Sequence, residues 1–159
     1  MSGSDRSHGA DRFHALLLIA ILPGLISFYW IAYFSSDWTL PKFAIHPGSS
    51  SAEDLTSVYL GFENAFPLPD AFVAVTSAIA GLYLLGRDAK AALFGIFSGG
   101  GLMFLALIDI YFNILQHFYT RKVLIGSSAL DLEIAINLAC FVGSVWSVWR
   151  LWGHPLRKT

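Results

Sequence analysis

A carboxylate, two amides and an imidazole lie close together on one apolar stretch of the chain: Asp109, Asn113, Gln116 and His117. At 3.6 residues per turn, the first three share a narrow sector of a helix, and His117 lies at the edge of that sector. The sequence around them is apolar from about residue 91 to residue 119, which is long enough to cross a bilayer. Because ionisable residues inside such a span are costly, they indicate a functional site by default. We therefore take all four as candidate ligand-binding residues.

Two further candidates for ligand binding lie on the last apolar stretch, where Glu133 and Asn137 are four residues apart and share a helix face. For Glu133, the alternative is a first-turn carboxylate that interacts with the helix dipole. Acid–base chemistry would need a proton-transfer group, for which Asp109, Glu63 and His117 are the candidates. A purely structural alternative is that Asp109 and Asn113 hydrogen-bond across to Asn137, and such contacts in membranes contribute about 0.6 kcal/mol on average.

The same residues do not predict a metal site. Asp109 and His117 would lie about 12 Å apart along a helix that rises 1.5 Å per residue, and the chain has no HxxxH or HExxH motif. No cofactor is predicted either, although His117 is a candidate axial ligand for a pigment or a haem. A single cysteine, Cys140, excludes an internal disulfide and a CxxC redox motif.

Composition predicts an all-α integral membrane protein. Of 159 residues, 55% are hydrophobic and 13% are charged, and the mean hydropathy is +0.60. The charged share is about half of that in soluble domains. A net charge of −1 gives no reason to expect a nucleic-acid partner.

Four apolar runs predict a four-transmembrane-helix bundle that occupies residues 13–152, between tails at 1–12 and 153–159. Its spans cover about 13–34, 70–86, 91–119 and 130–150. An amphipathic helix at about 51–66, opened by the capping-box pattern Ser50–Glu53, is expected in the first extracytoplasmic loop, with Glu63 at the edge of its apolar face. The short turn at 86–90 makes the second and third spans antiparallel neighbours.

Basic residues next to the spans predict that both termini are cytoplasmic, in a bacterial-type inner or plasma membrane. Seven flank one side (Arg6, Arg12, Arg87, Lys90, Arg150, Arg157, Lys158), and three flank the other (Lys42, Arg121, Lys122). With this orientation, the polar residues at membrane depth fall in the outer half, and the inner halves have almost none. The pattern predicts a pocket that opens outward, with its floor near Asp109 and the 51–66 helix as its lid.

Other residues have structural interpretations. Tyr29, Trp30 and Tyr33 are typical of an aromatic belt, and Asp70 suits the first turn of a helix. Small residues recur every four positions in two ladders, which permit close helix contact inside the bundle or with a partner. The ladders are Ala91, Gly95 and Gly99, and Ala135, Ala139, Gly143 and Ser147.

Three functions remain open. Small size, the lack of a soluble domain and the lack of a catalytic motif slightly favour an accessory or structural subunit of a larger membrane complex, with other membrane-protein subunits and membrane lipids as partners. The clustered acids favour an outer-leaflet binder of a lipid or a small apolar ligand. The same acids also allow a small membrane enzyme that uses acid–base chemistry.

Overall fold

A computed structural model describes residues 3–35, 58, 61–116 and 127–152. The regular elements of these ranges are all helical: α1 (Gly3–Leu16), the π-helix η1 (Leu17–Ile21), α2 (Leu22–Ser35), α5 (Pro67–Leu85), α6 (Lys90–Leu115) and α7 (Ser127–Trp152). Four helices are long and apolar enough to cross a membrane, and the first of them is formed by α1, η1 and α2 together. The predicted all-helical fold is therefore confirmed, and the length and composition of its helices are those of a multi-pass membrane protein.

The helices extend beyond several of the predicted limits. The first begins at Gly3, although its span was predicted from residue 13, and the last begins at Ser127, although its span was predicted from residue 130. α5 begins at Pro67, because a proline suits the first helical position, where its missing N–H is not needed. Most of the predicted 51–66 helix and residues 117–119 of the third span lie outside the described residues; residues 58 and 61–63 are helical.

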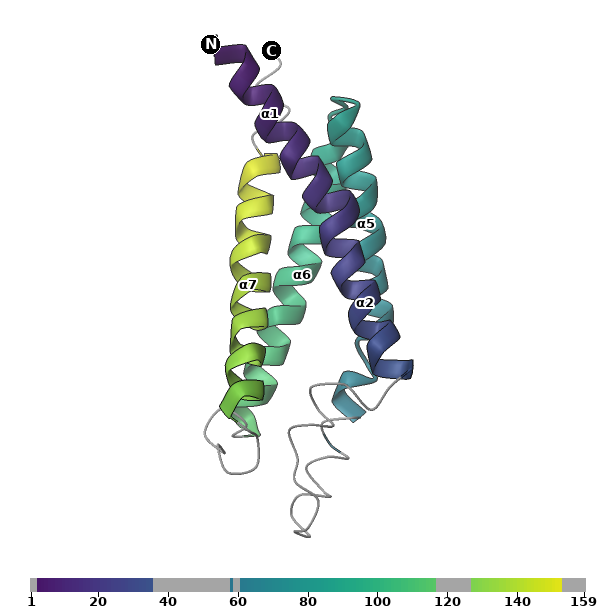
Figure 1. Cartoon of the computed structure of the whole chain (residues 1–159), viewed down its shortest axis with the longest axis vertical. Coiled ribbons are helices and arrows are strands. Elements are labelled where there is room, and N and C mark those ends of the chain that lie inside the picture. The colour runs from purple at the N-terminus through teal and green to yellow at the C-terminus, as the bar shows by residue number, and fades with distance from the viewer. Residues whose placement is uncertain (1–2, 36–57, 59–60, 117–126, 153–159) are drawn as a thin grey trace.

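Each helix packs mainly on its neighbour in the chain. α5 contacts α1, η1 and α2 on one side and α6 on the other, and α6 contacts α7. Figure 1 shows that the start of α1 and the end of α7 lie at the same end of the molecule. We call this the terminal end, and the opposite end, which holds residues 61–70, the distal end.

The predicted antiparallel pairing of the second and third spans is confirmed. The Gly86 N–H bonds to the Leu82 carbonyl at the end of α5, and Arg87 then adopts a left-handed conformation with φ 56°, as residues that terminate helices often do. The Asp88 carboxylate accepts a hydrogen bond of 2.8 Å from the Lys90 N–H, which caps the start of α6. The turn therefore reverses the direction of the chain, so that α6 runs back along α5.

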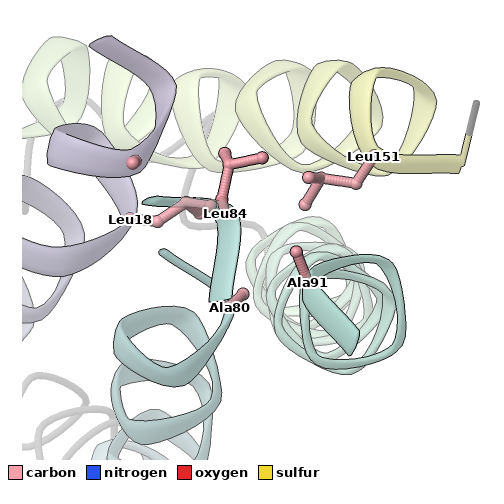
Figure 2. Close-up of a cluster of buried hydrophobic side chains, with 6 residues drawn as sticks. Leu18, Ala80, Leu84, Ala91 and Leu151 are labelled. Atoms are coloured by element: carbon pink, nitrogen blue, oxygen red, sulfur yellow. The ribbon is translucent and has the colours of Figure 1, made fainter. Parts of the chain in front are cut away.

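The hydrophobic core lies toward the terminal end. Leu84 of α5 lies between Leu18 of η1 and Leu151 of α7, and Ala91 of α6 completes the contact (Figure 2). Leu18, Leu84, Ala91 and Leu151 are each at most 5% exposed. All four spanning helices thus meet in this half of the molecule.

Glycines allow two pairs of helices to approach closely, namely α5 with η1 and α6 with α7. A Cβ on Gly81 would lie 2.5 Å from Ile19 Cγ1, and a Cβ on Gly99 would lie 2.6 Å from Val148 Cγ2. A Cβ on Gly95 would overlap Leu151. The Ala91–Gly95–Gly99 ladder therefore faces α7, inside the bundle.

The second ladder divides between the two sides of α7. Ala135 and Ala139 are exposed, and no atom lies within 4 Å of the place where a Cβ would stand on Gly143. Ser147 is buried. Most of this ladder therefore faces away from the bundle.

The π-helix explains a hydrogen bond between the first helix and α5. The Leu22 N–H bonds to the Leu17 carbonyl instead of the Leu18 carbonyl, and Pro23 has no N–H that could replace it. Ser77 Oγ donates to the Leu18 carbonyl at 2.8 Å. A serine on a neighbouring helix thus supplies the donor that the backbone lacks, as Ser and Thr do beside prolines in membrane helices.

We expect Ser77→Ala to lower the free energy of unfolding by about 1 kcal/mol, the typical contribution of one such bond. In a Pro23→Ala background, where residue 23 regains its N–H, the same substitution should cost less than half as much. Unfolding of the four variants in mixed detergent micelles, followed by circular dichroism, measures this cycle. Equal costs in both backgrounds would show that Ser77 does not compensate for Pro23.

Candidate functional site

Asp109 lies at the centre of the polar residues near the distal end of α6. The Asn113 amide, one turn further along, donates to Asp109 Oδ1 at 3.2 Å, and the Asn137 side chain of α7 also hydrogen-bonds to the Asp109 carboxylate. Asn113 is fully buried, and Asn137 is 5% exposed. Of the predicted structural alternative, the bond between Asp109 and Asn137 joins α6 to α7, whereas the Asn113 amide bonds to Asp109 within α6.

A second group of polar contacts attaches α2 to residues 63–70, which include the start of α5. Tyr29 donates its hydroxyl to Glu63 Oε2 at 2.8 Å, and the Trp30 indole donates to Asp70 Oδ2 at 2.8 Å. Tyr33, one turn beyond Tyr29, donates to Asn64 Oδ1 at 3.2 Å. Since Glu63 is only 8% exposed, it points inward.

The two groups are close to one another. Asp109 lies within electrostatic range of both Tyr29 and Asp70. Phe62 stacks on Phe112 of α6, with their ring centres 3.8 Å apart. We therefore treat them as one distal polar cluster, which comprises Tyr29, Trp30, Tyr33, Glu63, Asn64, Asp70, Asp109, Asn113 and Asn137.

The cluster contains three carboxyl groups, which are its main hydrogen-bond acceptors. Glu63, Asp70 and Asp109 accept hydrogen bonds from a phenol, an indole and two amides, all of which are neutral donors. An ionised carboxylate has room for several donors, so each of these groups can also accept a hydrogen bond from a hydroxyl or amino group of a ligand. In the part of the chain that the structure describes, no group of His, Cys, Asp and Glu is arranged to hold a metal ion.

The predicted site residues divide into three sets. Asp109, Asn113, Asn137 and Glu63 belong to the cluster. Gln116 is half-buried at the C-cap of α6, where its backbone N–H bonds to the Phe112 carbonyl at 2.9 Å. His117 and the side chain of Glu133 lie outside the described residues, and haem or pigment ligation by His117 stays a prediction.

Sequence patterns did not predict the part that the aromatic residues play in the cluster. The sequence indicates an aromatic belt for Tyr29, Trp30 and Tyr33, and an interaction with the helix dipole for Asp70. The available signal was the grouping of three donor-bearing rings within five residues, followed by acids at 63 and 70. Buried Tyr and Trp usually find a polar partner, and here the partners are these acids and Asn64.

A second polar set lies at the terminal end, and it corrects the expectation that the inner halves of the spans almost lack polar groups. His14 is 1% exposed, and its Nε2 lies 3.2 Å from Ser147 Oγ. Arg150 donates to Asp11 at 3.1 Å. Because the helix begins at Gly3, Asp11 and His14 lie within it. Both pairs fit one antiparallel register, since Asp11 and His14 are three positions apart on α1, and Ser147 and Arg150 are three positions apart on α7.

The geometry of these two sets is the basis for any assignment of function. No protein-family model, curated protein or solved structure matches the chain.

Proposed function

We propose that this chain is a membrane-embedded binding protein whose distal polar cluster holds a lipid or a small apolar ligand. The observation that supports this proposal most strongly is the convergence of Glu63, Asp70 and Asp109 from three segments onto one end of the bundle. Carboxylates at membrane depth are expensive, and where they occur they mark binding sites or pathways more often than simple packing. In this proposal the distal end is extracytoplasmic and both termini are cytoplasmic, as the basic residues predict.

The ligand chemistry follows from the groups that the cluster offers. Asp109 accepts hydrogen bonds, and Asn113 next to it fixes the orientation of its carboxylate. A ligand with a hydroxyl or amino group can donate to Asp109, and the apolar helix faces around the cluster can accommodate its hydrocarbon body. Asp109 and Asn113 are therefore the residues that would orient the ligand.

Native mass spectrometry of the gently solubilised protein tests this function. We expect the wild-type protein to retain a small bound molecule, and Asp109→Asn to lower its occupancy about tenfold, which corresponds to one charge-assisted hydrogen bond. Asp11→Asn is the matched control, because it removes the same charge at the terminal end. Equal occupancy in wild type and Asp109→Asn would contradict the proposal.

A second candidate function, an accessory subunit of a membrane complex, is favoured by the outward side of α7. Ala135, Ala139 and Gly143 are small residues on this face. Small residues on a helix surface allow a partner helix to approach closely. The same spectra would then show a stoichiometric protein partner. Ala139→Leu should release the partner, whereas Asp109→Asn should not.

The third alternative, an acid–base enzyme, keeps Asp109 and Glu63 as candidates for proton transfer. Glu63 accepts from Tyr29 and Asp109 from Asn113, so each acid has a fixed orientation. Conversion of the bound molecule by wild type, and its loss in Asp109→Asn with an unchanged fold, would favour the enzyme over the binder.

A further inference from the structure

We infer that α2 is a gate over the distal polar cluster, and that it swings about Pro23 and Gly24 while α1 and η1 stay in place. The inference rests on the proposed function only in one respect, namely that the gate would admit the ligand. The motion itself can be measured in protein without ligand. Three features support it: an anchored segment before the hinge, a weak point at the hinge, and a polar latch after it.

The segment before the hinge is attached to the rest of the bundle at several points. Ser77 of α5 bonds to the Leu18 carbonyl, and Gly81 packs directly on η1. Asp11 and His14 contact α7 through Arg150 and Ser147. The buried apolar cluster of Figure 2 includes Leu18 in the same region. Movement of α1 would disrupt all of these contacts together.

The hinge lies where the helix has lost regular hydrogen bonding. η1 ends at Ile21, and Pro23 cannot donate a backbone hydrogen bond. Gly24 follows, and no atom lies within 4 Å of the place where its Cβ would stand. Helix bends are usually found at prolines, glycines and π-bulges, and all three occur here within eight residues.

The segment after the hinge is fastened by a latch on one side. The latch consists of the bonds from Tyr29 to Glu63, from Trp30 to Asp70 and from Tyr33 to Asn64. The acceptors all lie within residues 63–70, and among the helices α2 packs mainly on α5. Figure 1 shows that α2 and α7 diverge from the terminal end toward the distal end. An outward swing of α2 would therefore break the latch as a unit.

The residue that the gate would open further to a ligand is Asp109, which is half-buried in the closed arrangement. Asp109 is within electrostatic range of Tyr29, so release of Tyr29 changes the surroundings of Asp109. Cys140 of α7 is half-buried and lies within electrostatic range of both Asp70 and Asp109. Because it is the single cysteine of the chain, its alkylation can be followed without any added label site, and we expect opening of α2 to speed it.

The experiment measures the rate at which N-ethylmaleimide alkylates Cys140 in the full-length protein in lipid nanodiscs. We expect the latch variant Tyr29→Phe/Trp30→Phe to react about fivefold faster than wild type, because two hydrogen bonds no longer hold the closed state. Adding Pro23→Ala and Gly24→Ala, which stiffen the hinge, should return the rate to the wild-type value. Ser35→Ala is the control, because among the described residues its hydroxyl bonds to the Ile31 carbonyl of α2 itself.

Hydrogen exchange separates gating from general loosening. In the latch variant, faster exchange should be confined to residues 24–35, and residues 9–16 should exchange as in wild type. A wild-type alkylation rate in the latch variant, a failure of the hinge substitutions to reverse it, or faster exchange in both segments would overturn the gate. Loss of ligand in Asp109→Asn is a separate result, so either proposal can fail while the other stands.

Discussion

Substitution of Gly99 by leucine is expected to lower the free energy of unfolding by about 2–3 kcal/mol relative to the same substitution at Gly100, at the upper end of the usual cost of overpacking. A Cβ on Gly99 would stand 2.6 Å from Val148 Cγ2 and 3.3 Å from the Ser144 carbonyl oxygen. That carbonyl belongs to the backbone of α7 and cannot rotate away. The two helices must therefore separate, and packing is the main attraction between helices in lipid.

Gly100 provides the matched control, because it is the next residue of the same helix and no atom lies within 4 Å of its Cβ position. Both substitutions gain the same helix propensity, about 1 kcal/mol over glycine in water, so the difference isolates the contact with α7. Unfolding in mixed micelles, followed by circular dichroism, gives both values. Equal stability of the two variants would show that α6 and α7 do not meet at Gly99.

Substitution of Asp109 by leucine is expected to cost about 2 kcal/mol of stability, because it removes the acceptor for the side-chain amides of two buried asparagines. Asn113 and Asn137 are at most 5% exposed, so water cannot readily replace that acceptor. Asp109→Asn keeps an oxygen at the same place and should cost less than about 0.5 kcal/mol. Comparison of the two substitutions therefore separates the role of residue 109 as a hydrogen-bond acceptor from the effect of its charge.

The same unfolding measurement compares the leucine and asparagine variants with wild type. A leucine variant as stable as wild type would show that the two asparagines reorganise around new acceptors. In that case Asp109 would have little structural role. Because burying a carboxyl group at membrane depth costs free energy, ligand binding would then be the stronger reason for its presence.

The sequence was sufficient to predict the helices but not how each is rotated. The lengths of the apolar runs predicted four spanning helices, and the i, i+4 spacing of Asp109 and Asn113 correctly predicted a shared face. The Gly95–Gly99 ladder predicted a close contact, but the sequence could not tell whether it faced inward. A helix that is apolar on nearly every side has no distinct buried face, so the structure was needed to decide.

The contacts between distant segments were harder to predict for the same reason. Trp30 and Asp70 are forty residues apart, and their hydrogen bond depends on the rotation of two helices at once. His14 and Ser147 pair only because their helices run in opposite directions at a fixed register. No local pattern contains that register, although the equal spacing of Asp11–His14 and Ser147–Arg150 is consistent with it.

The contacts of Asp11 and His14 have a consequence for synthesis in the cell. Because residues 11 and 14 are translated well before residues 147 and 150, α1 can meet Ser147 and Arg150 only after α7 has been made. Until then, Asp11 and His14 cannot form these contacts. A nascent chain that stops before residue 147 can never form these two contacts, so translation of α7 is a condition for joining α1 to α7.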